Sequence, residues 1–148
     1  MKSYLKTTAG VVLSATMATA SYGATVNVGE LQGFTGPLES MIGAMSGGAN
    51  LAVTEVNASG TYLQGTINVV QGDSVCIDAA VAIAQAEKMV NDDNVMAIMG
   101  PNCSGNTGAV ITNVLVPNGI VSISPSATSP ALTTLEDGGW FFRTAPSD

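Results

Sequence analysis

Apolar segments of two different lengths alternate along this chain from residue 25 onward, and this alternation constrains the fold more than any other feature. The short runs, rich in β-branched and aromatic residues, have the length of strands. These candidate strands are residues 25–31, 66–71, 95–99, 119–124 and 140–144. Longer segments with helical spacing separate them, at 38–58, 77–90 and 105–115, with a brief helix at 130–135. Such alternation predicts an α/β fold with a doubly wound parallel sheet flanked by helices.

The helix and strand patterns also predict which faces are buried. In the helix at 38–58, apolar residues three or four positions apart form a candidate core-facing stripe. The residues of this stripe are Met41, Met45, Ala49, Ala52 and Val56, with Ile42 and Val53 beside them. The strand at 95–99 contains almost no polar residue, which is typical of a strand covered on both faces of a sheet.

The ends of the helices carry recognisable signals. Ser59-Gly60 is expected to end the helix at 38–58, because glycine accepts the left-handed conformation found after helices. The polar residues of 72–74 are expected to cap the helix at 77–90. Pro117 is expected to stop the helix at 105–115, since proline has no N–H to donate.

The first residues have the features of an export signal. Lys2 and Lys6 flank the start, a small and apolar stretch follows, and small residues precede a cleavage point near Gly23/Ala24. The stretch is too short and too polar to stay in a bilayer; a buried first helix is the alternative. We expect residues 1–23 to be a removed signal peptide and the protein to be periplasmic.

Charge and composition exclude several classes of function. Lys and Arg total 4 against 11 Asp and Glu, and removing the signal leaves Lys88 and Arg143 with a formal charge of −9. Such an acidic protein offers little to a nucleic acid or an anionic membrane surface. The chain has no histidine, the commonest metal ligand and the usual general base at neutral pH. We therefore expect no cofactor, no metal and no nucleic-acid partner.

The chain has two cysteines, Cys76 and Cys103. Export makes a disulfide permissible, and the spacing fits neither a zinc site nor a redox Cys-x-x-Cys pair. We predict a structural disulfide between them, with two buried free thiols as the alternative.

Two polar loops follow neighbouring candidate strands. Residues 100–108, Gly-Pro-Asn-Cys-Ser-Gly-Asn-Thr-Gly, follow the strand at 95–99, and residues 123–133 continue the strand at 119–124 with hydroxyl-rich sequence. Ligands of doubly wound sheets bind beyond the carboxyl ends of the strands. The two loops are therefore expected to form one pocket for a small polar ligand.

The residue types in these loops suit a zwitterion. Ser104, beside the amides that start a helix, could hold a carboxylate; a plain helix cap is the alternative. In Ser126-Ala127-Thr128, carbonyls and the Thr128 hydroxyl could accept hydrogen bonds from an ammonium group while amides serve a carboxylate. An ordinary strand-to-helix turn is the alternative there.

Several segments together carry a family resemblance. They are Phe34-Thr35-Gly36-Pro37, Leu51-Ala52, Glu55 to Gly60, Cys76 with Cys103, Ile123 to Pro130, and Phe142 to Asp148. In this order and spacing they resemble the amino-terminal lobe of a type I periplasmic solute-binding protein of the branched-chain amino acid uptake family. In that family a second lobe follows, so the resemblance implies that residues 24–148 are one lobe, truncated before the other.

The resemblance implies a receptor that captures an amino acid or amide between two lobes and presents it to the membrane permease of an ABC transporter. Carried over by position, Ser104 corresponds to the hydroxyl that binds the ligand carboxylate. Ser126, through its main chain, and Thr128 correspond to the pair that holds carboxylate and ammonium, with Ala127 between them. Met41 stands where the family often has an aromatic residue against the ligand, a departure from its branched-chain pocket.

Two other classes of function compete with this interpretation. An enzyme could use Ser104 or Ser126 as a nucleophile, but Lys88 would have to serve as the base, and we expect no enzymatic activity. The other class is a ligand-sensing domain of a receptor, or an amide- or urea-binding regulator of the same fold. Fold alone does not separate a carrier from a sensor.

Overall fold

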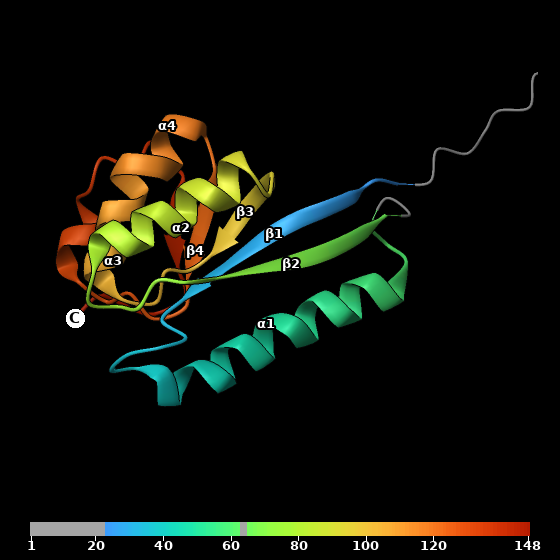
Figure 1. The fold of residues 1–148 in the computed structure, drawn as a ribbon, viewed down its shortest axis with the longest axis horizontal. Helices are drawn as coiled ribbons and strands as arrows, with labels where there is room; N and C mark the ends of the chain where they lie inside the picture. Colours follow the sequence, from blue (N-terminus) through green and yellow to red (C-terminus); the bar gives the residue numbers. More distant parts are fainter. Residues whose placement is uncertain (1–22, 63–64) are drawn as a thin grey trace, which may run out of the picture.

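The computed structural model describes residues 23–62 and 65–148, so residues 1–22 of the predicted signal peptide lie outside the described residues. Five parallel strands form one sheet in the order β2-β1-β3-β4-β5. The strands are β1 (Thr25–Gln32), β2 (Thr66–Asp73), β3 (Val95–Met99), β4 (Val121–Ser124) and β5 (Phe141–Arg143). The predicted α/β fold with a parallel sheet is confirmed (Figure 1).

Helices connect the successive strands. They are α1 (Glu39–Ser59), α2 (Ala79–Asn91), α3 (Ser104–Val110), the π-helical η1 (Ile111–Leu115), α4 (Val116–Asn118) and the 3-10 helix η2 (Pro130–Thr133). Strand β1 pairs with β2 on one side and with β3 on the other, so the strand order reverses beside β1. A reversal of this kind opens a crevice at the carboxyl ends of the strands.

The main core lies on one face of the sheet, under α2, α3 and η1 (Figure 1). Its largest fully buried side chains include Leu31, Met89, Ile98, Ile111 and Leu115. Met89 of α2 packs where β1 has Gly29, since a Cβ on Gly29 would lie 3.0 Å from the Met89 sulfur. The sheet and its helices therefore meet through a close-packed apolar layer.

Helix α1 packs on the opposite face along β2, and it turns a different stripe to the sheet than predicted (Figure 1). Its buried residue is Ile42, whereas Met41 is 50% exposed and Val56 is 36% exposed. Asn57 fixes this rotation, because its side chain exchanges two hydrogen bonds with the main chain of Ile67, both 2.8 Å. The buried side of α1 is thus shifted by about one position from the predicted stripe, toward Ile42 and Val53, which the sequence places beside it.

The strand β3 is not covered on both faces, which corrects the sequence prediction. Val95 and Ile98 are buried against the helices, but a register shift in β3 opposite β1 changes the alternation of its side chains. On the opposite face, Ile123 and Phe142 are 45% and 54% exposed. In the part of the chain that the structure describes, this apolar face of β3 to β5 is only partly covered.

The cap of α2 also differs from the sequence prediction. Helix α2 is capped by Asp78, whose carboxylate accepts hydrogen bonds from the Ala80 amide at 2.8 Å and the Val81 amide at 3.3 Å. Among the predicted caps at residues 72–74, Asp73 instead accepts a hydrogen bond from the Val75 amide at 2.9 Å, in the turn that follows β2. Side-chain caps of this kind stabilise a helix by about 1 kcal/mol.

Pro117 does not stop the third helix. The chain widens into the π-helical η1 just before it, and the Val116 amide bonds to the Ile111 carbonyl, five residues back. The wider turn accommodates a residue that has no N–H for the ordinary helical bond. Helix α4 then ends at Gly119, in the left-handed region with φ of 64°.

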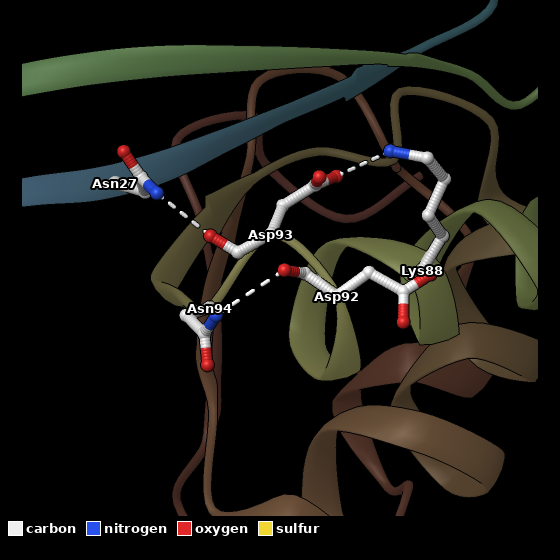
Figure 2. A network of polar contacts seen from close by, with 5 residues as sticks. All are labelled: Asn27, Lys88, Asp92, Asp93 and Asn94. Atoms are coloured by element: carbon white, nitrogen blue, oxygen red, sulfur yellow. Dashed lines mark hydrogen bonds and ion pairs between the residues drawn. The ribbon is translucent and has the colours of Figure 1, made fainter.

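A polar network closes the turn between α2 and β3 (Figure 2). The Lys88 ammonium pairs with the Asp93 carboxylate at 2.6 Å, and Asn27 donates to the Asp93 carbonyl at 2.7 Å. Asn94 donates to the Asp92 carbonyl at 3.2 Å. This network lies at the amino ends of β1 and β3, the sheet edge opposite the two loops singled out in the sequence.

No helix within residues 23–62 and 65–148 combines the length and hydropathy needed to cross a membrane.

Candidate functional site

The two polar loops meet at the carboxyl ends of β3 and β4, which are paired strands. We call residues 100–104 and 125–129 the rim loops. The Ser126 hydroxyl donates to the Asn102 carbonyl at 2.9 Å, and the Ser129 amide donates to the Ser104 hydroxyl at 3.2 Å. The structure therefore brings Ser104 and the segment around Thr128 together at one rim.

Glycine at position 100 allows this approach. Gly100 has φ of 115°, and a Cβ there would collide with the Leu31 carbonyl oxygen of β1. The first rim loop can therefore turn across the end of β1. There the Asn102 side chain accepts a hydrogen bond from the Gly33 amide at 2.8 Å, so that the loop is joined to β1.

The disulfide predicted from the sequence is present. Cys76 and Cys103 are bonded, with Cα atoms 5.4 Å apart. Cys103 directly precedes Ser104, and Cys76 lies in the turn after β2, so the bond joins the ends of β2 and β3. It fixes the start of α3, from which Ser104 projects.

Thr128 has an acidic neighbour that sequence reasoning missed. Its hydroxyl donates to the Asp148 carboxylate at 2.9 Å, and the Asp148 amide donates to the Thr128 carbonyl at 3.0 Å. Asp148 lies a few residues after β5, which pairs with β4, so its place at the same rim follows from strand order. The only sequence indication was its position at the end of the motif from Phe142 to Asp148.

Ala127 is fully buried, and both of its main-chain groups have protein partners. Its amide donates to the Ser124 hydroxyl at 3.0 Å, and its carbonyl accepts from Arg143 at 3.2 Å. Ser126 and Thr128 on either side are half-buried. The loop thus turns its centre inward and its flanking residues toward solvent.

A groove of about 390 Å³ lies between α1 and the ends of β3 and β4. Its lining is mostly apolar, with one hydroxyl: Ala44, Met45, Gly48, Ala49, Met99, Ile123, Pro125 and Thr144. Met41 is not among the lining residues. Met45, one turn further along α1, places its sulfur 4.0 Å from the Ser126 hydroxyl, so it is Met45 that the structure brings to the rim loops.

The turn after β2 is organised by Asp73. Partial burial raises the pKa of this carboxyl, but hydrogen bonds from the Thr35 hydroxyl and from the amides of Val75, Thr35 and Phe34 outweigh it, so the pKa lies below its ordinary value. The bond from the Thr35 hydroxyl is 2.6 Å long. Asp73 therefore ties the loop after β1 to the turn that carries Cys76.

These features can be compared with those of known proteins. The family model described as "Periplasmic binding protein" matches residues 25–148, which include all five strands and both rim loops. The chain belongs to the periplasmic binding protein family. This agrees with the resemblance seen in the sequence.

Several known members of the periplasmic binding protein family are similar to this chain. The Leu/Ile/Val-binding protein of Escherichia coli is 34% identical over 105 residues, 64% of this chain and 28% of that protein. The branched-chain amino acid transporter substrate-binding protein of Streptococcus pneumoniae, solved with isoleucine, is 33% identical with a TM-score of 0.75. That match covers 83% of this chain and 34% of the solved chain.

A third similar structure is an ABC transporter substrate-binding protein from Desulfitobacterium hafniense in complex with Leu. It is 25% identical with a TM-score of 0.67, over 83% of this chain and 35% of that chain. Our chain therefore spans about a third of the length of the relatives that it matches.

The contacts of the two rim serines bear on the enzyme alternative. Ser104 and Ser126 are hydrogen-bonded to main-chain groups. Lys88, the base that a serine enzyme would need, is paired with Asp93 at the opposite edge of the sheet. Among the described residues, no cluster of three or more His, Cys, Asp or Glu could hold a metal ion.

Proposed function

We propose that residues 24–148 form the amino-terminal lobe of a substrate-binding protein that captures an amino acid for the permease of an ABC transporter. The observation that carries this proposal is the meeting of the rim loops, which joins Ser126 to Asn102 and Ser104 to Ser129, with the Asp148 carboxylate held by the Thr128 hydroxyl at the same rim. Such a set offers donors to a carboxylate and an acceptor to an ammonium group. A zwitterion needs both.

The ligand roles that we propose follow from this chemistry. Ser104 and the Thr128 amide would donate to the ligand carboxylate, while Asp148 and the Ser126 carbonyl would accept from its ammonium group. Ala127, buried between Ser126 and Thr128, would hold these two residues in position through its own main-chain hydrogen bonds. The groove beside Met45 would receive an aliphatic side chain, because apolar surface of this kind favours burial of methyl and methylene groups. Met41, one helical turn before Met45 on α1, would contact only a ligand that extends beyond this groove.

The similar proteins support the ligand class. The names of the relatives include Leu, Ile and Val as ligands, and the similar solved structures hold isoleucine and Leu. Because our chain spans about a third of those proteins, we propose that a second lobe completes the pocket. One lobe alone leaves a ligand exposed on one side, whereas binding sites bury most of a ligand's surface.

Removing a hydroxyl from the rim should weaken binding. In the full-length mature protein, Thr128→Ala and Ser104→Ala are each expected to reduce amino acid affinity about 5- to 150-fold. Ser104→Ala removes a donor to the ligand carboxylate, and Thr128→Ala removes the hydroxyl that holds the Asp148 carboxylate in place for the ammonium group. A thermal-shift panel of amino acids, amides and urea would identify the ligand, and calorimetry would measure its affinity. Thr112→Ala is the matched control, since the Thr112 hydroxyl bonds within its own helix to Gly108. Unchanged affinity in both rim variants would remove the proposed roles.

The proposed export signal has a separate test. Expressed in a bacterium with a periplasm, the protein should be recovered from the periplasm with Ala24 as its first residue, because small residues precede that position. Intact-mass measurement reads the cleavage point directly. A protein that keeps Met1 and stays in the cytoplasm would refute the assignment of residues 1–23.

A further inference from the structure

Arg143 of β5 has an unusual set of partners for a charged side chain. Its Nη1 atom donates to the Ala127 carbonyl at 3.2 Å and to the Ser129 carbonyl at 3.0 Å, and its Nη2 atom donates to the Thr133 hydroxyl at 2.6 Å. Within residues 23–62 and 65–148, the one ion pair found is that of Lys88 with Asp93. The charge of Arg143 is therefore directed at the main chain of the second rim loop.

These bonds determine which way the peptide groups of the loop face. A trans peptide group is planar, and its C=O and N–H point in opposite directions. Because the Ala127 carbonyl is turned to Arg143, the Thr128 amide is turned away from Arg143. Likewise, because the Ala127 amide is turned to the Ser124 hydroxyl, the Ser126 carbonyl is turned away from Ser124.

A count of hydrogen bonds shows which groups of the loop remain available. The Thr128 carbonyl accepts from Asp148, the Ser129 amide donates to Ser104, and the Ser129 carbonyl accepts from Arg143 and Leu132. In the described part of the chain, the amides of Ser126 and Thr128 and the Ser126 carbonyl have no such partner. Two donors, the amides of Ser126 and Thr128, and one acceptor are thus left over, on either side of a fully buried Ala127.

We infer that Arg143 is a positioning residue, whose guanidinium holds the Ala127 and Ser129 carbonyls so that the Thr128 amide is presented to the carboxylate of the ligand. This inference rests on the proposed function. A cation at the oxygen end of the Ala127–Thr128 peptide group also polarises that group, which strengthens the N–H at its other end as a donor to an anion. Lysine cannot replace it in full, because only the planar guanidinium spans both carbonyls and Thr133.

The test compares two substitutions that each remove one positive charge. Arg143→Gln removes the contacts to the rim loop, and Lys88→Gln removes a cation at the opposite sheet edge. In the full-length mature protein, affinities for L-leucine and for leucinamide, which lacks the carboxylate, are measured by calorimetry. We expect Arg143→Gln to weaken L-leucine binding about 10- to 30-fold and leucinamide binding less than 3-fold, with Lys88→Gln close to wild type for both.

A merely structural role would give a different result. Loss of stability alone would lower both affinities by the same factor, and the ratio of L-leucine to leucinamide affinity would stay at its wild-type value; that outcome would overturn the inference. Arg143→Lys, which keeps the charge, should fall between wild type and Arg143→Gln. If Arg143→Gln fails to fold, the same ratio is read from Arg143→Lys.

A spectroscopic measurement separates this inference from the proposed function. In ¹⁵N–¹H NMR spectra without ligand, the Thr128 amide signal should shift or broaden in Arg143→Gln and stay in place in Lys88→Gln. A wild-type protein that binds neither L-leucine nor leucinamide would count against the proposed function, and the Thr128 signal would still decide the role of Arg143. An unchanged Thr128 signal in Arg143→Gln would refute that role.

Discussion

Replacing Gly100 with alanine is expected to remove about 3 to 5 kcal/mol of folding stability, a large part of what a domain of this size has. Two costs combine. The residue has φ of 115°, where an L side chain is strained by about 1 to 3 kcal/mol. The added methyl group would also collide with the Leu31 carbonyl oxygen, and forced packing costs about as much again. Urea unfolding followed by circular dichroism would measure the loss.

Gly105→Ala is the matched control for this substitution. Gly105 lies near the start of α3, and a Cβ there would meet nothing within 4 Å. Because alanine favours helix over glycine, this variant should be unchanged or more stable by up to about 1 kcal/mol. A loss below about 1 kcal/mol in Gly100→Ala, or an equal loss in both variants, would show that the close approach to β1 is not required.

Removing the disulfide is expected to cost about 3.5 kcal/mol in the double variant Cys76→Ser and Cys103→Ser. The two residues are 27 apart in sequence, and the figure follows from the loop-closure entropy that the bond removes from the unfolded chain. Thermal unfolding of the oxidised and double-serine proteins would give the difference. Wild type treated with reductant should approach the double variant.

The same variant also tests how far the bond supports the rim. Cys103 directly precedes Ser104, so loss of the bond should loosen the start of α3 as well as lower the melting temperature. Hydrogen exchange of the amides at residues 103–107 should therefore increase more than that of α2. Identical unfolding of oxidised wild type and the double variant would contradict the stabilising role.

Local patterns in the sequence predicted the elements of the fold well. Every predicted strand is present, and the sheet is parallel, because short apolar runs between helical segments leave few other arrangements. The errors came from interactions between distant residues. Asn57 bonds to Ile67 and thereby sets the rotation of α1, and the π-helical turn before Pro117 allows that helix to continue. Neither effect is visible in hydrophobic spacing.

The candidate site was predicted in outline, because the carboxyl ends of neighbouring parallel strands meet at one edge. Its finer features depend on residues from other elements. Asp148 and Arg143 reach the second rim loop from the region of β5, and Asn102 joins the first rim loop to Gly33. Such contacts follow from strand order, which sequence periodicity does not specify.

Strand β4 is only four residues long, with the sequence Val-Ser-Ile-Ser, and so short a strand has few contacts to fix its alignment. Its two serines are fully buried, and they donate to the carbonyls of Gly100 and Pro101, both at 2.6 Å. Sliding β4 by a single position would exchange these hydroxyls for Val121 and Ile123 side chains; the Gly100 carbonyl would lose its hydroxyl donor, and the Pro101 carbonyl would keep only the bond from Thr107. The two serines thus fix the alignment of β4, and with it the distance between Thr128 and Ser104 in the ligand-free protein.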